Sequence, residues 1–126
     1  MRLPALLSAL LALPALAADP PAKPLSPAEA AKKVNEKVTV QMEVKSTGGK
    51  EVCFLNSEAD YQDAQNFTVF LPREAMEKFK KAKIDDPAAH FKGKTIRVTG
   101  TVKLYRDKPE IVVNDPDKEI KVVEKK

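Results

Sequence analysis

Three stretches of this sequence alternate apolar and polar side chains with a period of two, and this pattern constrains the fold more than any other feature. They span residues 38–44, 67–71 and 96–105, and the last is the longest. A period of two places successive side chains on opposite faces, which is typical of a strand that is buried on one face only. The sequence therefore predicts a mainly β protein whose sheet covers one apolar core.

Shorter segments complete the expected sheet. Residues 51–55 and 110–114 predict two more strands, and residues 106–109 predict the hairpin turn before the second of them. A turn is also expected at 46–49, and a short tail strand over 120–123. Gly100 falls at an inward-facing position of the longest strand, where a glycine often marks a bend in a small barrel.

Two helices are expected between the second and third alternating stretches. Pro72 ends the strand before it and opens a helix over 73–83, which is apolar on one side and mostly charged on the other. Asp86, followed by proline, is typical of a helix cap and predicts a short helix that ends at Gly93. Because helix separates only one pair of strands, a parallel α/β fold is not expected.

The first 18 residues are typical of a secretory signal peptide. Arg2 precedes an apolar run over 3–16, which contains prolines and ends in small alanines. A membrane anchor would need about 20 apolar residues without prolines. No cysteine follows that could carry a lipid, so the mature protein is expected to be exported, to a periplasm or the outside, with no membrane anchor.

The remainder of the chain has room for one domain. Residues 19–25 predict a mobile proline-rich spacer, and residues 26–126 a single domain. The domain opens with a capping box, Ser26 to Glu29, that begins a helix expected to reach Glu36. The chain is 43% hydrophobic, which is enough for a core, and the domain is expected to be a monomer.

The order of these elements, three strands, helix and then a hairpin, matches a five-stranded Greek-key barrel with a helix between its third and fourth strands. At this point the chain resembles the oligonucleotide/oligosaccharide-binding fold, or OB-fold, and more closely a group of exported bacterial OB-fold proteins. Similar segments also occur beside nucleases. The segments that carry the resemblance are 54–56, 67–69, 91–100, 104–106 and 109–113.

The resemblance implies a binding surface on the second and third strands and in the loops that join strands one to two and four to five. Cations near an aromatic ring in those loops could follow a phosphate backbone and stack a base. An alternative is that these lysines are solvated edge residues that discourage aggregation. The candidate ligand-binding residues are Lys45, Lys50, Lys103, Tyr105, Arg106 and Lys108.

Other residues leave alternatives open. Phe70 falls on the polar face of its strand, where it is either a stacking platform or a core residue under a loop. Tyr61 lies in an acidic loop, 56–66, whose carboxylates are either solvated or a loose calcium site. The lone Cys53 is a disulfide partner, a reactive thiol or a buried side chain, and its apolar neighbours favour burial.

No arrangement in the sequence favours catalysis or a cofactor. His90 has no second histidine or cysteine near it for a metal, and capping the short helix is the simpler role. The basic residues of the helix over 73–83 are balanced in part by Glu74 and Glu77 and are expected at the base of the barrel. A nuclease would need clustered carboxylates beside arginines, and the closest pairs here lie in turns.

The sequence therefore predicts a non-enzymatic binding module. Single-stranded nucleic acid, another extended polyanion or an anionic oligosaccharide is the expected ligand, and the fold resemblance favours nucleic acid. The charge permits this without requiring it, because removal of the signal peptide would leave 21 basic and 18 acidic residues. The alternative is an exported protein-interaction or envelope-stress component that binds a protein partner.

Overall fold

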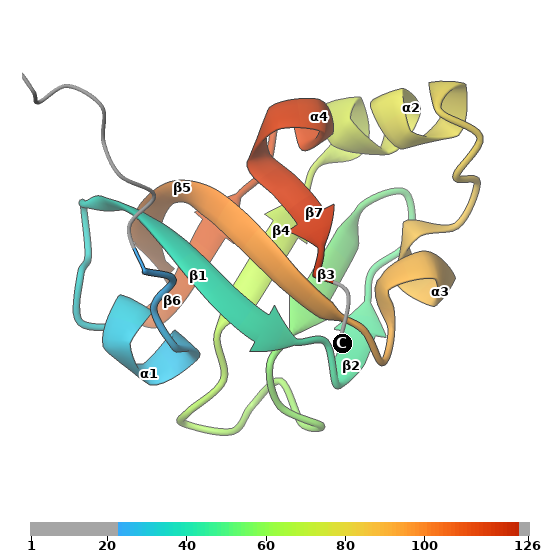
Figure 1. Ribbon diagram of the computed structural model, residues 1–126. Helices are drawn as coiled ribbons and strands as arrows, with labels where there is room; N and C mark the ends of the chain where they lie inside the picture. Colours follow the sequence, from blue (N-terminus) through green and yellow to red (C-terminus); the bar gives the residue numbers. More distant parts are fainter. Residues whose placement is uncertain (1–22, 124–126) are drawn as a thin grey trace, which may run out of the picture.

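A computed structural model of the chain describes residues 23–123 (Figure 1). The predicted signal peptide, 1–18, lies outside the described residues, as does most of the predicted spacer. The described part holds seven strands and four short helices. The strands are β1 (Lys37–Glu43), β2 (Ser46–Gly48), β3 (Cys53–Asn56), β4 (Thr68–Leu71), β5 (Thr95–Tyr105), β6 (Lys108–Val112) and β7 (Ile120–Val122).

The strands form one sheet in the order β1-β5-β6-β4-β3-β2, with β7 added to the free edge of β5. All pairs are antiparallel except β4 with β6, which run parallel. The long β5 pairs with β1 through its first half and with β6 through its last residues, so it curves across the whole molecule (Figure 1). The predicted mainly β architecture is confirmed.

The predicted five-stranded barrel differs from the structure in two respects. The sheet has seven strands, and its pairing follows an open path that ends at β1 and β2. These two strands are consecutive in the chain, since β1 ends at Glu43 and β2 begins at Ser46. The Val44 N–H donates to Lys94 O, beside β5, and the Lys45 N–H donates to Asn56 O, in β3. At these two residues the chain therefore passes from β1, at one end of the strand order, to β2, at the other end.

The core lies on the concave side of this sheet. The inward-facing residues are those expected from the period of two: Val40, Met42 and Val44 are buried, as are Phe67, Val69 and Leu71. Ile96, Val98 and Val102 of β5 and Ile111 of β6 complete this layer. At roughly 25 cal/mol for each Å² of apolar surface buried, this layer supplies most of the free energy that holds the curved sheet together.

Gly100 lies where the partners of β5 change from β1 to β6, as the sequence predicted for a bend. A Cβ at this position would lie 2.6 Å from Cγ2 of Ile111, which is fully buried and cannot move away. Only a glycine lets β5 pass this close to β6 while it pairs with β1 on the other edge.

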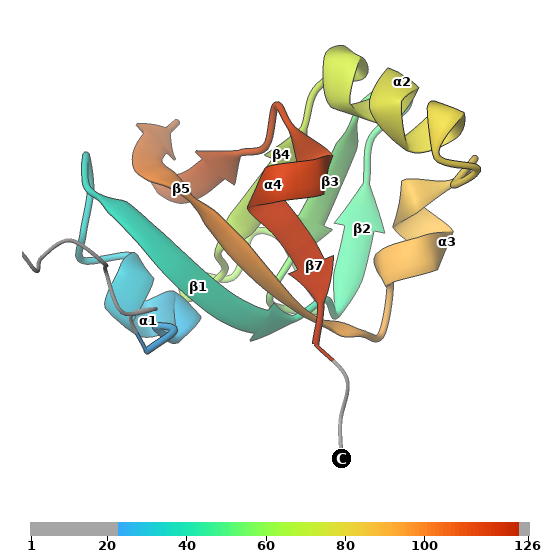
Figure 2. The same cartoon turned by 45° about the horizontal axis from the view of Figure 1, so that its top comes forward.

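The four helices are α1 (Pro27–Ala30), α2 (Arg73–Lys81), α3 (Pro87–Phe91) and α4 (Pro116–Glu119). Figures 1 and 2 show α2 and α3 together at one end and α1 at the other. The capping box between Ser26 and Glu29 is present, but α1 ends at Ala30 rather than at the expected Glu36. None of the helices within residues 23–123 has the length and apolar character needed to span a membrane.

Three local expectations differ from the structure. The turn predicted at 46–49 contains β2, and α4 forms in a segment where the sequence predicted no helix. Leu25, placed by the sequence in the mobile spacer, is bound to β1: its N–H donates to Thr39 O at 2.8 Å, and its carbonyl accepts from Gln41 N at 2.9 Å. For Leu25 the partner is a separate strand, which a local propensity cannot foresee. By contrast, β2 pairs with the nearby β3, and in α4 the Glu119 carboxylate accepts from the N–H groups of Asn114 and Asp115.

Candidate functional site

A pocket of about 680 Å³ opens on the outer face of the sheet, where β2, β3 and the β5–β6 turn meet the loop over 57–66. Three aromatic side chains lie around it, from β3, the loop and the end of β5. Two cations and two carboxylates complete its charged lining. These residues are Phe54, Tyr61, Tyr105, Arg106, Lys108, Asp60 and Glu110.

The period of two explains the apolar side of the pocket. Cys53 and Leu55 point into the core, so Phe54 between them faces outward. Phe70 lies directly opposite on β4, and the two rings pack with centroids 5.0 Å apart. Phe70 is therefore half-buried on the outer face rather than in the core, and it supports Phe54, which lines the pocket.

A buried polar network forms the floor. Thr68 Oγ1 donates to Asn56 Oδ1 at 3.0 Å and accepts from Asn66 Nδ2 at the same distance. Asn66 Oδ1 accepts from the Glu58 N–H, and Ser57 Oγ accepts from the Phe67 N–H at 2.9 Å. Because Asn56 and Asn66 are buried and each is hydrogen-bonded, the network holds both ends of the 57–66 loop against the sheet.

The acidic loop is folded by its own carboxylates. Asp60 Oδ1 accepts from the Gln62 N–H at 2.9 Å, and Asp63 Oδ1 accepts from the Gln65 N–H at 2.8 Å. Such turns engage each carboxylate locally. No group of three or more metal-ligating side chains gathers anywhere in residues 23–123, so nothing there adds to the calcium alternative for this loop.

The β5–β6 turn presents an aromatic ring and a guanidinium side by side. Arg106 and Asp107 both adopt positive φ, 52° and 67°, as a two-residue hairpin turn requires. The Arg106 guanidinium carbon lies 5.3 Å from the centroid of the Tyr105 ring, within cation–π distance. Tyr105 remains 54% exposed and Tyr61 61% exposed, so both rings have a face open to a ligand.

The turn is also tied to the loop. Lys108 Nζ donates to the Gln62 carbonyl at 3.4 Å, which joins the two sides of the pocket. Glu110, two residues further along β6, is half-buried, and burial raises the pKa of its carboxyl group above the ordinary value. The pocket therefore combines apolar walls, two cations at its rim and a desolvated carboxylate inside.

The structure brings together half of the predicted site residues. Tyr105, Arg106 and Lys108 line the pocket. Lys45 lies 4.0 Å from a Glu58 carboxylate oxygen, and Lys103 donates to Asn35 Oδ1 at 3.4 Å. Neither of these two lysines lines the pocket, and the exposed Lys50 lies outside it as well.

Phe54, Glu110 and Tyr61 belong to the pocket although the sequence analysis did not include them as site residues. The alternation carried a signal for the first two, because each neighbours core residues and must face outward. For Tyr61 the sequence offered only one indication of a binding role, namely an aromatic residue within a polar loop. Tyr61 and Tyr105 lie far apart in the chain, so the sequence could not indicate that both line one pocket.

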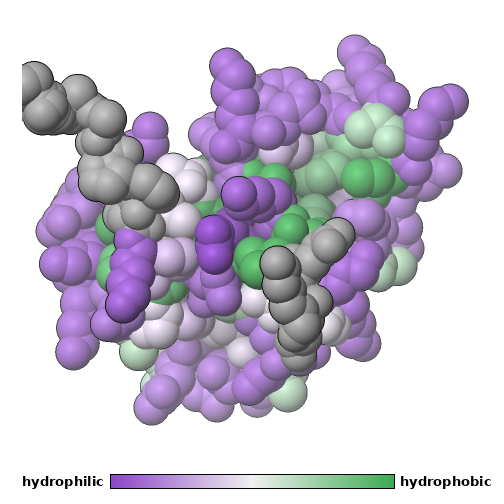
Figure 3. Space-filling view, viewed as in Figure 1, coloured by the Kyte–Doolittle hydropathy of each residue, from purple (hydrophilic) through white to green (hydrophobic). Residues whose placement is uncertain are grey.

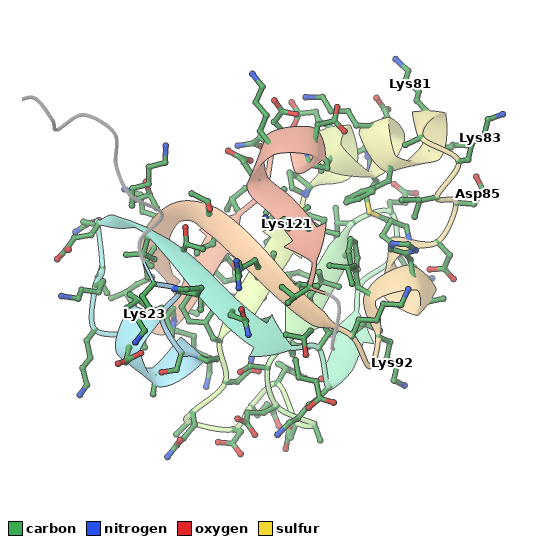
Figure 4. All side chains as sticks on the ribbon, in the orientation of Figure 1. Lys23, Lys81, Lys83, Asp85, Lys92 and Lys121 are labelled. Atoms are coloured by element: carbon green, nitrogen blue, oxygen red, sulfur yellow. The ribbon has the colours of Figure 1, made fainter. Side chains whose placement is uncertain are left out.

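Other candidate residues lie elsewhere. Cys53 is buried, and burial raises the pKa of its thiol to about 11, so it is protonated and unreactive at neutral pH. The ring of His90 packs edge-on against Phe91, with centroids 4.7 Å apart, and desolvation lowers its pKa. Lys81 and Lys83 point away from the sheet at the far end of α2 (Figure 4).

A second, smaller pocket of about 260 Å³ lies over β1, β5 and the α4–β7 segment. Part of its polar lining is engaged: Arg97 Nε donates to Gln41 Oε1 at 2.9 Å, and the hydroxyls of Thr39 and Thr99 are 2.8 Å apart. Hydrophilic residues cover most of the face that carries these strands (Figure 3). No aromatic side chain of residues 23–123 lines this pocket.

Comparison with known proteins identifies the fold and no family. No protein-family model and no curated protein matches the sequence. Among solved structures, an OBody bound to hen egg-white lysozyme superposes with a TM-score of 0.56 at 18% identity, over 86% of this chain and all of that one. Asparaginyl-tRNA synthetase from Pyrococcus horikoshii gives 0.53 at 17% identity, over 80% of this chain.

Aspartyl-tRNA synthetase from Entamoeba histolytica gives a TM-score of 0.53 at 18% identity, over 79% of this chain. The present chain spans only 23% and 21% of the length of these two synthetases. At these identities the likeness concerns the fold alone. It supports the OB-type architecture that the sequence resemblance implied.

Proposed function

We propose that this protein is a non-enzymatic OB-type module that binds single-stranded nucleic acid in the pocket between the 57–66 loop and the β5–β6 turn. The observation that carries the proposal is the pairing of open aromatic rings with cations at one pocket. Tyr61 and Tyr105 can each stack a base, while Arg106 and Lys108 lie at the rim, where the phosphates of a stacked strand would pass.

The structural neighbours add limited support. Two of them are tRNA synthetases, of which this chain matches a part, and a third, the OBody, is bound to a protein. The fold is therefore compatible with either kind of ligand. The cations beside the rings favour the nucleic acid, because each nucleotide brings a base that can stack on Tyr61 or Tyr105 and a phosphate that can pair with Arg106 or Lys108.

Titration of the mature protein with a labelled single strand of about ten nucleotides, followed by fluorescence anisotropy, tests the proposal. Two phosphate contacts predict that affinity falls roughly five- to tenfold between about 50 mM and about 200 mM salt. Tyr105→Ala combined with Arg106→Ala should leave folding intact and remove most of the binding.

A matched control is Leu104→Ala combined with Lys92→Ala. Leu104 is as exposed as Tyr105, and Lys92 lies at the end of α3, away from the pocket (Figure 4). This control should bind like the wild type. Absence of binding at low salt, or equal loss in both double variants, would overturn the proposal. An affinity that does not change with salt concentration would argue against phosphate contacts. It would favour the alternative, an interaction or envelope-stress component whose apolar contacts serve a protein partner.

Export belongs to the same proposal and rests on residues 1–18 alone. Expression of the full chain in a bacterium with a secretion pathway, followed by N-terminal sequencing, is expected to give a mature chain that begins after Ala17 or Ala18. An uncleaved Met1 would contradict export. Size-exclusion chromatography of the mature chain is expected to show a monomer.

A further inference from the structure

One carboxylate in the pocket has no partner. Glu110 is half-buried among the pocket residues, yet no hydrogen bond or ion pair reaches its side chain from any of residues 23–123. The two nearest lysines are engaged elsewhere. Lys103, directly opposite on β5, donates to Asn35, and Lys108 donates to the Gln62 carbonyl.

Two neighbouring polar side chains of the pocket are engaged within the protein. Thr68 lies beside Glu110 in the β4–β6 pair, but its hydroxyl is bound to Asn56 and Asn66. Asp60 accepts a backbone N–H from its own loop through Oδ1. Of the two described carboxylates that line the pocket, Glu110 is therefore the one that a ligand would meet with both oxygens unpaired.

An unpaired carboxylate at this depth costs free energy, and its burial raises its pKa, as a missing hydrogen-bond partner would lead one to expect. A ligand that donates hydrogen bonds to both carboxylate oxygens would recover this cost. A volume of about 680 Å³ is ample for one aromatic ring stacked on Tyr61 or Tyr105.

We propose that Glu110 makes the pocket selective for guanine in a single strand. A carboxylate offers two acceptors side by side, and the Watson–Crick edge of guanine offers two adjacent N–H donors, N1–H and the N2 amino group. Adenine and cytosine place an acceptor next to their amino donor, and thymine has only one N–H on that edge. This inference rests on the proposed function, because it assigns the base that enters the same pocket.

The test uses labelled oligothymidine of about ten nucleotides that carries one central guanine, adenine or hypoxanthine. Hypoxanthine keeps N1–H but lacks the amino group. Wild-type protein should bind the guanine strand about tenfold more tightly than the other two, as a two-donor contact predicts. Glu110→Gln, which replaces one acceptor oxygen with a donor, should lose the preference for the guanine strand.

Glu43→Gln is the matched control, since Glu43 is an exposed carboxylate on β1 outside the pocket and its substitution changes the charge equally. It should keep the preference for guanine. Equal wild-type affinity for all three strands would overturn this inference and leave the proposed function standing, whereas no binding to any strand would overturn both. A guanine preference that survives Glu110→Gln would assign the selectivity to another group.

Discussion

The two ends of this molecule both carry lysine and arginine, yet only one of them forms a pocket. At the helical end, α2 holds the densest run of cations in the chain, including Arg73, Lys78 and Lys81. At the other end, the β5–β6 turn has only Arg106 and Lys108 at the pocket. The end with fewer charges is the one that can enclose a ligand.

The difference lies in what surrounds the charges. On α2 the apolar side is buried through Ala75 and Phe79, and the cations stand on a convex helix in water. Arg73 pairs with Glu51, and Lys78 donates to the Asn114 carbonyl. At the pocket, loop and turn leave aromatic rings exposed beside the cations. Charge density alone therefore does not identify a binding site, because shape and apolar contact must accompany it.

The largest expected effect is on stability at the helical end. Phe79 is buried and packs edge-on against Phe91, with ring centroids 5.6 Å apart, so Phe79→Ala should lower the free energy of unfolding by about 3–5 kcal/mol. Chemical denaturation measures this change. Below the unfolding transition, the variant should bind single strands like the wild type. If the folded variant bound them more weakly, the helical end would contribute to binding and the contrast between the two ends would fail.

At the pocket the reverse is expected. Tyr105→Ala removes an exposed ring that no core residue needs, so stability should change by less than about 0.5 kcal/mol. Affinity for a single strand should fall by about 1–3 kcal/mol, the contribution of one stacked base. Denaturation and anisotropy on the same sample separate the two effects. Unchanged affinity would remove Tyr105 from the binding surface.

A single cation sharpens the comparison between the ends. Lys108→Ala should reduce the slope of log affinity against log salt by about 0.7, since one phosphate contact is lost. Lys80→Ala combined with Lys81→Ala removes twice the charge from α2 and should leave the slope unchanged. If the α2 variant gave the larger reduction, the helical end would be the nucleic-acid surface.

The smallest expected effect concerns pH. Because burial raises the pKa of Glu110 in the folded state, the folded protein holds this proton more tightly than the unfolded chain does. The contribution of Glu110 to the free energy of unfolding should therefore fall as pH rises from about 4.5 through the raised pKa, whereas His90, whose pKa is lowered, contributes in the opposite direction. Glu110→Gln should flatten this part of the profile and stabilise the protein at pH 7 by less than about 1 kcal/mol, after allowance for solvent screening.

Thermal melts of wild type and Glu110→Gln across this pH range measure the effect. Glu43→Gln again serves as a control, and its profile should follow that of the wild type. The decisive quantity is the difference between the wild-type and Glu110→Gln profiles, in which the contribution of His90 cancels. If the stability of the wild type relative to Glu110→Gln rose through this window, Glu110 would be stabilised by a partner in the folded state, which would contradict the unpaired carboxylate.

Much of the fold followed from local pattern. The alternation correctly assigned the inward side chains of β1 and β4 and those of β5 as far as Val102, but Leu104, expected on the same apolar face, is exposed. The proline and capping signals correctly began α2 and α3. The errors fell on β2, α1 and Leu25. After the shortened α1 the Asn35 N–H donates to Val102 O, and Leu25 is bound to β1, so a remote strand determines these two conformations, whereas β2 pairs with the adjacent β3. Burial repeats every second residue along a strand, whereas a remote partner leaves no mark on the local sequence.

For the candidate site, the sequence by itself determined which residue types could act: an aromatic residue and two cations in one hairpin turn. Only the tertiary structure decided that Tyr61 and Phe54 share a pocket with them, that Lys45, Lys50 and Lys103 do not, and that Glu110 is left unpaired. The reason is physical. Exposure and pairing of a side chain depend on which segments the folded sheet brings together, and these segments lie some fifty residues apart in the chain.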